Sequence, residues 1–232
     1  DLLRSGQLDD ALSQLEQALK FNPADAQTEN DLGAVLVQKG DSDAAIPHFQ
    51  KAVELDPTSA LAEFNLGNVF REKGQADEAI RHYDNGLQLT DDPGVESAVG
   101  RLLLKKKRWN DAAARFERAL KLDPSLTRAQ EGAAYVVWAL ATSPDRSVRD
   151  GPKAMELARR ADQLAGGKNP IVTAALAAAC AETGRFPDAV ANAELALRLA
   201  REQNQTNLVP IIQKQLRCYQ AATPFRDPSL SR

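Results

Sequence analysis

The feature that most constrains this chain is an internal repeat with a period of 34 residues. Three kinds of landmark recur at that spacing: a Pro after Asn or Asp, a Gly, and a His. They are Asn22-Pro23 and Asp56-Pro57, Gly40 and Gly74, and His48 and His82. A unit of this length cannot bury its own apolar face and becomes stable only when it stacks on its neighbours. The chain is therefore expected to form an array of stacked units.

Within each unit, small and apolar residues recur at helical spacing. An alanine is followed four residues later by a larger residue and three residues after that by a small one, as in Ala45, Phe49 and Ala52. This spacing places the three side chains on one face of a helix. The alanine recurs in six segments, as Ala11, Ala45, Ala79, Ala112, Ala154 and Ala189. The Pro that follows Asp or Asn disfavours helix at the residue before it and so ends each unit. We predict an all-α fold of antiparallel helix pairs.

These residues resemble the tetratricopeptide repeat (TPR) family, whose 34-residue helix–turn–helix carries the pattern W-x2-L-G-x2-Y, A-x3-F and P. Leu32-Gly33 and Leu66-Gly67 match its L-G pair. The family's first aromatic residue is replaced, repeat by repeat, by Glu29, Glu63, Glu96 and Gln130. The resemblance extends from residue 1 to about residue 203. It implies an α-solenoid, the TPR superhelix, with about five full repeats and one truncated repeat.

The predicted repeats are followed by a different C-terminal segment. We place them at 1–25 (partial), 26–59, 60–92, 93–126, 127–169 and 170–203. The partial repeat lacks most of a first helix, which indicates a fragment of a longer protein. The repeat at 127–169 contains a loop insert, Thr142–Gly151, in which Asp150 is the expected N-cap of the next helix. Residues 204–232 are expected to form a capping helix over Asn207–Ala222 and a tail, or alternatively a helix that docks on a partner.

Composition and motifs argue against several classes of protein. The net charge is −3, with −11 over residues 1–92 and +4 over each of 93–151 and 152–232. This balance does not favour nucleic-acid binding. No charge-free stretch reaches the roughly 18 residues of a membrane-spanning helix, so no direct membrane insertion is expected. No nucleotide-binding or catalytic motif is present, and we predict no enzymatic activity and no cofactor. The compartment, cytoplasmic or periplasmic, stays open.

Three groups of residues are candidates for special sites. His48 and His82 are expected on neighbouring ridges of the outer face, without the further ligands that a metal needs. Cys180 is expected to be a buried small residue. The basic run of residues 105–108 lies in the turn of its repeat, where it is either solvated or in contact with phosphate or an acidic partner. No metal site is predicted.

In TPR proteins the first helix of each pair lines the concave groove, and the resemblance places a basic and aromatic set there. It consists of Asn68, Arg71, Arg101, Lys105, Arg128, Tyr135 and Trp138. Arginine grips carboxylates through two hydrogen bonds, Asn bonds peptide backbone, and Tyr and Trp dominate interface energetics. The set predicts capture of an extended acidic segment or of the C-terminus of a protein. Alternatively, Trp138 packs beneath the loop insert, and the arginines pair with Glu72 and Glu131.

The leading prediction is a non-catalytic protein–protein interaction scaffold that binds a peptide or protein in its groove. Residues 139–203 also resemble the terminal TPR segment of large bacterial multidomain proteins. That resemblance implies an alternative, the regulatory or substrate-presenting arm of a membrane-linked glycosyltransferase-like protein. A third hypothesis is self-association, with the terminal helix docked in the groove of a neighbouring copy.

Overall fold

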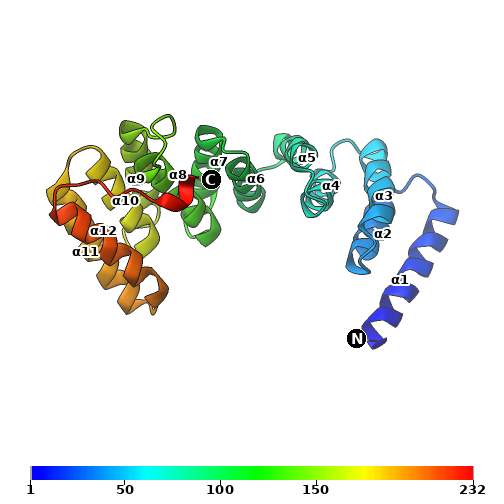
Figure 1. Cartoon of the computed structure of the whole chain (residues 1–232). Helices are drawn as coiled ribbons and strands as arrows, with labels where there is room; N and C mark the ends of the chain where they lie inside the picture. Colours follow the sequence, from blue (N-terminus) through cyan, green and yellow to red (C-terminus); the bar gives the residue numbers. More distant parts are fainter. Residues whose placement is uncertain (1, 232) are drawn as a thin grey trace. The chain divides into compact units, whose positions relative to one another are not determined.

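The computed structural model describes residues 2–231, and the side chains of residues 7–230, as helices joined by short turns (Figure 1). No strand occurs in residues 2–231. The predicted all-α fold of stacked antiparallel helix pairs is confirmed. The protein divides into two compact units, residues 1–95 and 96–232, and each is described by itself.

The first unit consists of one helix and two helix pairs. Its helices are α1 (Leu2–Phe21), α2 (Ala26–Gln38), α3 (Ser42–Leu55), α4 (Ala60–Glu72) and α5 (Ala76–Leu89). Helix α2 packs on α3, α4 on α5, and α3 joins the two pairs by packing on α4. The turns inside the pairs pass through Gly40 and Gly74, which have φ of 87° and 76°. Side chains other than glycine rarely adopt this left-handed conformation, which explains why a glycine recurs at this point of the repeat.

The other recurring glycines allow the helices of a pair to approach closely. A Cβ atom built on Gly67 of α4 would lie 2.5 Å from the ring of Tyr83 on α5. A Cβ atom on Gly33 would lie 2.7 Å from the ring of Phe49. Both distances are too short for carbon atoms in contact. The large residue of the second helix therefore fills the space that the glycine of the first helix leaves open.

The second unit contains three helix pairs and a terminal helix. Its helices are α6 (Pro93–Lys105, which begins at the boundary), α7 (Trp109–Leu122), α8 (Thr127–Thr142), α9 (Gly151–Leu164), α10 (Pro170–Glu182), α11 (Phe186–Glu202) and α12 (Val209–Gln220). Phe116 of α7 is fully buried, and its ring occupies the space beside two glycines, Gly100 of α6 and Gly132 of α8. Helix α8 packs on α7, α9 and α10, and α12 packs on α11.

The loop between α8 and α9 is tied to the helices on both sides. Asp150 accepts a hydrogen bond from the backbone N–H of Lys153, as expected for the N-cap of α9. The Arg149 side chain donates to the carbonyl oxygen of Ser143 at 2.7 Å and pairs with Glu182 of α10 at 3.2 Å. These contacts fix the course of the loop insert against α10.

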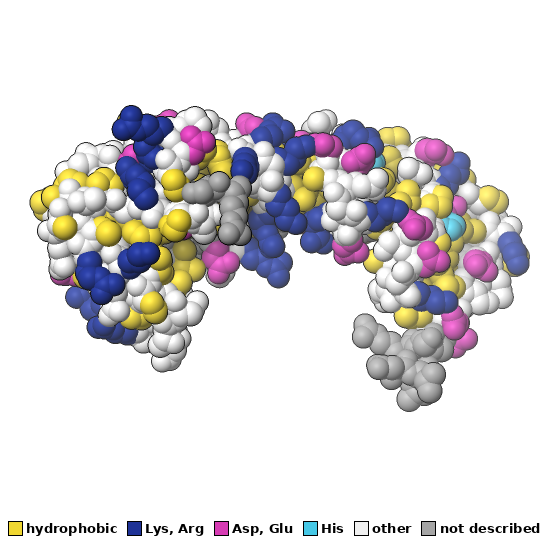
Figure 2. Space-filling view, viewed as in Figure 1, with side chains coloured by type: hydrophobic (Ala, Val, Ile, Leu, Met, Phe, Trp, Pro, Cys, Tyr) yellow, Lys and Arg dark blue, Asp and Glu magenta, His cyan; other side chains and the backbone are white. Residues whose placement is uncertain are grey.

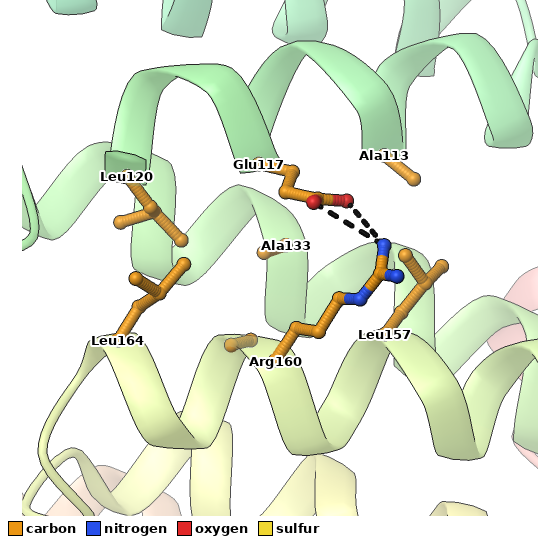
Figure 3. A pocket seen from close by; sticks show the side chains of 8 residues that line it. Ala113, Glu117, Leu120, Ala133, Leu157, Arg160 and Leu164 are labelled. Carbon is orange, nitrogen blue, oxygen red and sulfur yellow. Dashed lines mark hydrogen bonds and ion pairs between the residues drawn. The ribbon is translucent and has the colours of Figure 1, made fainter. Parts of the chain in front are cut away.

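A seam between α7 and α9 is closed by an ion pair. Figure 3 shows Glu117 of α7 and Arg160 of α9 facing each other across apolar side chains, with Arg160 Nη1 donating to both carboxylate oxygens at 3.0 and 3.2 Å. Burial alone would raise the pKa of Glu117, but hydrogen bonds from Lys121 and Arg160 outweigh it and hold the pKa below its usual value. The cavity enclosed there is only about 10 Å³, too small for a ligand. This seam therefore has a packing role.

The glutamates that replace the family's first aromatic residue pair with basic residues on the second helix of the same repeat. In three consecutive repeats the partner lies 19 positions later, in the pairs Glu29–His48, Glu63–His82 and Glu96–Arg115. Nδ1 of His82 lies 2.7 Å from the Glu63 carboxylate, and the Arg81 guanidinium lies 2.9 Å from Nε2, so both ring nitrogens have a partner. The expectation that both histidines lie on the outer face is wrong for His82, which is buried under the stacked ring of Phe70.

Candidate functional site

The second unit contains an open cleft of about 300 Å³ between α8, α10 and α12. Its lining is mainly apolar and comes from Glu131, Ala134, Tyr135, Trp138, Ile171, Ala174, Ala175, Leu208, Ile211, Ile212, Gln215 and Asp227. Two large side chains at this cleft are exposed to solvent, Tyr135 at 45% and Ile211 at 37%. Figure 2 shows hydrophobic side chains at the surface over this end of the second unit. The alanines of α10 make the cleft possible because their short side chains leave room between α8 and α12.

The C-terminal tail folds back and holds Trp138 at one edge of the cleft. The Trp138 indole N–H donates to the Asp227 carboxylate at 2.8 Å, and the Trp138 ring packs on Phe225 with centroids 5.7 Å apart. The backbone N–H of Asp227 donates to the carbonyl oxygen of Thr142. The sequence favoured Trp138 either as a groove residue or as a residue packed beneath the loop insert. Trp138 lines the cleft, and its hydrogen-bond partner lies in the tail, a contact that the sequence pattern did not reveal.

A second set of contacts anchors the tail. Arg226 donates to the carbonyl oxygen of Ala141 at 3.1 Å and pairs with Glu182 at 2.6 Å. Glu182 also binds Arg149 of the loop insert, so one carboxylate joins the tail, the loop and α10. The cationic Nζ of Lys214 lies 5.5 Å from the ring centroid of Phe225. Residues 223–227 are thus an extended segment already bound along the end of α8 (Figure 1).

We expect the contact between the tail and Trp138 to weaken in acid. Burial alone would raise the pKa of Asp227, but hydrogen bonds from Trp138 and Ser229 outweigh it and hold the pKa below its usual value. A carboxyl group with a lowered folded-state pKa stabilises the folded form above its unfolded-state pKa of about 4 and loses this effect as pH falls through the folded-state pKa. The indole N–H signal of Trp138 in NMR should therefore shift below about pH 4.

The protein supplies controls for this titration. Trp109 is the other tryptophan, and its indole signal should not follow the same curve. Asp227→Asn should abolish the transition at Trp138, and Asp227→Ala should give the shifted signal already at neutral pH. A Trp138 signal that titrates equally in Asp227→Asn would contradict the assigned hydrogen bond.

The predicted binding residues fall into both units. In the first unit Asn68 and Arg71 are exposed on α4 and share a partner, the phenol of Tyr83. Tyr83 Oη donates to Asn68 at 2.8 Å and accepts from Arg71 Nε at 3.1 Å. Arg71 also lies 3.8 Å from Glu72, the partner that the alternative interpretation gave it. These two residues are therefore held together by the repeat's own tyrosine.

In the second unit Arg101 and Lys105 are exposed on α6, and Arg128 is exposed near the start of α8. Among the residues whose side chains are described, none of these three has a hydrogen bond or ion pair. The pairing of an arginine with Glu131, which the alternative interpretation gave, is not made by Arg128 within these residues. Figure 2 shows dark blue Lys and Arg side chains gathered over α6 and α7. Of these basic residues, Arg101, Lys105 and Arg128 are available to a partner.

The basic run of residues 105–108 borders a second, more polar cleft of about 590 Å³, between the start of α7 and the loop insert. Lys107 has φ of 55° in the turn, and Arg108 is paired with Asp111 at 2.7 Å. Arg149, on the opposite wall, forms an ion pair with Glu182. The arginines at this cleft thus have internal partners.

The residues after 203 that line the apolar cleft were not predicted to do so. Ile211, Ile212 and Gln215 on α12 and Asp227 in the tail all line it. The amphipathic run of α12 predicted a capping helix, but its period does not reveal which residues face α10.

Within the described residues, no group of three or more His, Cys, Asp or Glu is placed to hold a metal ion. No helix in that range is long and apolar enough to cross a membrane.

Comparison with known proteins agrees with this architecture. YrrB, described as a TPR protein with an unusual peptide-binding site, is 19% identical with a TM-score of 0.64, covering 86% of this chain and 97% of its own. MamA is 21% identical with a TM-score of 0.58, covering 71% and 92%. A TPR protein from Parabacteroides merdae is 16% identical with a TM-score of 0.55, covering 94% and 89%. These likenesses show a shared fold.

Sequence comparison places the family in the first part of the protein. The tetratricopeptide repeat family model matches residues 1–60 and 30–94. No curated protein has significant sequence similarity to this one. The protein therefore carries tetratricopeptide repeats in residues 1–94, and its second unit has the same fold of stacked helix pairs.

Proposed function

We propose that this protein is a non-catalytic scaffold that binds an extended segment of a partner protein along α8, α10 and α12. The observation that carries the proposal is the open apolar cleft, with Tyr135 exposed at its edge. Exposed apolar patches with polar rims mark interaction sites, and tyrosine is among the residues that contribute most to binding. At about 300 Å³ the cleft is at the small end for ligand pockets, which suits one or two side chains.

The charged residues suggest which segment fits. Arg128 precedes Tyr135 by seven residues on α8, two helical turns, so both lie on one face about 10 Å apart. An extended peptide covers that distance in about three residues. A partner with an acidic side chain about three residues from a large apolar one would pair the first with Arg128 and insert the second in the cleft. Arg101 and Lys105 on α6 supply further positive charge for the acidic side of the segment.

The fold supports the proposal at a coarser level. TPR arrays generally act in protein–protein interaction, and YrrB, which shares this fold, is described as having a peptide-binding site. Contact of a peptide with Asn68 and Arg71, in the first unit, stays a prediction. The glycosyltransferase-linked arm and self-association through the terminal helix also stay predictions, because no contact in the described residues favours either.

The proposal is tested by selecting peptides from a random library on the purified protein and measuring their affinities by fluorescence anisotropy. We expect selected peptides to combine an acidic and a large apolar residue. Tyr135→Ala should weaken binding at least tenfold, and Arg128→Ala should weaken it while reducing its salt dependence. Leu122→Ala is the matched control, because Leu122 is similarly exposed at 44% but does not line the cleft. Enrichment of no peptide, or equal loss in Tyr135→Ala and Leu122→Ala, would contradict the proposal.

A further inference from the structure

One polar side chain in the cleft has no partner. Gln215 of α12 is only 1% exposed and lines the cleft, yet neither its carboxamide oxygen nor its nitrogen forms a hydrogen bond within the described residues. Buried polar groups are nearly always paired, since an unpaired one loses its hydration without replacement. Its neighbour Ile212, also 1% exposed, shows how apolar this wall is. A hydrocarbon-lined cleft with one unpaired carboxamide is suited to a ligand that brings its own amide.

The chemistry of a carboxamide matches that of peptide backbone. It offers one acceptor oxygen and two N–H donors, so it can pair with a backbone N–H and C=O at the same time. From this match we infer that Gln215 binds the backbone of a peptide whose large apolar side chain lies in the cleft. This inference rests on the proposed function and adds how the segment is recognised: the cleft selects the side chain, while Gln215 fixes the backbone irrespective of sequence.

The charges around the cleft narrow the class of ligand. Its two carboxylates are Glu131 and Asp227, and the second is already hydrogen-bonded to Trp138. Negative charge here disfavours a fatty acid or another small anion, whose carboxylate would approach both. An extended peptide avoids this conflict because its backbone is neutral. Beside the cleft, the tail already pairs in extended form with the end of α8, since Asp227 N–H donates to the Thr142 carbonyl oxygen.

The inference is tested first with two small probes of the same shape. N-acetyl-leucine methylamide has two backbone N–H groups, and its ester analogue methyl 2-acetoxy-4-methylpentanoate has none. Titrated into the ¹⁵N-labelled protein, the amide should shift the side-chain NH₂ signals of Gln215 and bind several-fold tighter than the ester. Unshifted Gln215 signals, or equal binding of amide and ester, would overturn the inference.

Substitution of Gln215 separates this inference from the proposed function. Gln215→Leu replaces the carboxamide with an apolar group of similar size. The urea midpoint of unfolding should therefore be unchanged or higher. Amide and ester probes should then bind alike, and peptides selected from the library should bind at least tenfold more weakly. Gln213→Leu is the control, since Gln213 is exposed on the same helix and does not line the cleft. If selected peptides depend on Tyr135 but not on Gln215, the scaffold function stands and the backbone contact is wrong.

Discussion

Phe116→Ala is expected to destabilise the second unit by about 3–5 kcal/mol, the range for removing a buried phenylalanine. The ring is fully buried, and the space it fills is shaped by glycines on both sides. Built Cβ atoms would lie 2.8 Å from the ring at Gly100 and 2.3 Å at Gly132, so the neighbouring helices touch it directly. Glycine has no side chain that can move into the vacated space, and the cavity cannot easily collapse.

Tryptophan fluorescence in urea measures this effect in the right unit, because both tryptophans of the protein, Trp109 and Trp138, lie in residues 96–232. The unfolding of the second unit must be followed by itself, because two compact units need not unfold in one transition. Leu122→Ala is the control on the same helix, with an exposed side chain and an expected change within about 0.5 kcal/mol. A loss below about 1 kcal/mol in Phe116→Ala would show that the ring is not the packing centre of α6, α7 and α8.

Arg115→Ala is expected to destabilise the same unit by about 3 kcal/mol, because it removes a partner from a buried carboxylate. Glu96 is 0% exposed and accepts from Arg115 Nη1 at 3.1 Å. Arg118 Nε lies 3.2 Å from the other carboxylate oxygen and remains in the variant, so the loss should be near the lower limit for a broken buried pair. Breaking the pair leaves a charge that the surrounding helices cannot solvate.

The repeat itself supplies the test of this explanation. The two preceding repeats have histidine at the same position, paired with Glu29 and Glu63. Arg115→His should therefore restore at least half of the stability lost in Arg115→Ala, measured by the same urea titration. If His and Ala at position 115 are equally destabilising, the loss comes from packing of the arginine stem and the pairing account is wrong.

The repeat allowed the fold to be predicted because each landmark has a local physical cause. Gly40 and Gly74 are needed for the left-handed turn, and Gly67 is needed for the approach of Tyr83. The glutamates at the family's aromatic position looked like departures from the pattern, and His48 and His82 looked like a repeated surface pair. Their 19-residue spacing was visible in the sequence, but only the packing of the two helices shows that they compensate each other.

The candidate site was less predictable because it depends on contacts between segments far apart in the sequence. Trp138 meets Asp227 across 89 residues, and no periodicity links them. The tail has no repeat to align, so nothing in its residues indicated that it returns to α8. Gln215 was indistinguishable from the other glutamines of α12 until its burial was known. The exposure of Arg101, Lys105 and Arg128 was predictable because first-helix positions follow directly from the repeat register, and their contact with a partner stays a prediction.

The most direct test of the central claim is a crystal structure of the protein with a selected peptide. The account predicts density for an extended peptide along α8, with its large apolar side chain between Tyr135 and Ile211 and its acidic side chain at Arg128. Peptide density on another surface, with the cleft between α8, α10 and α12 unchanged from the peptide-free protein, would contradict it.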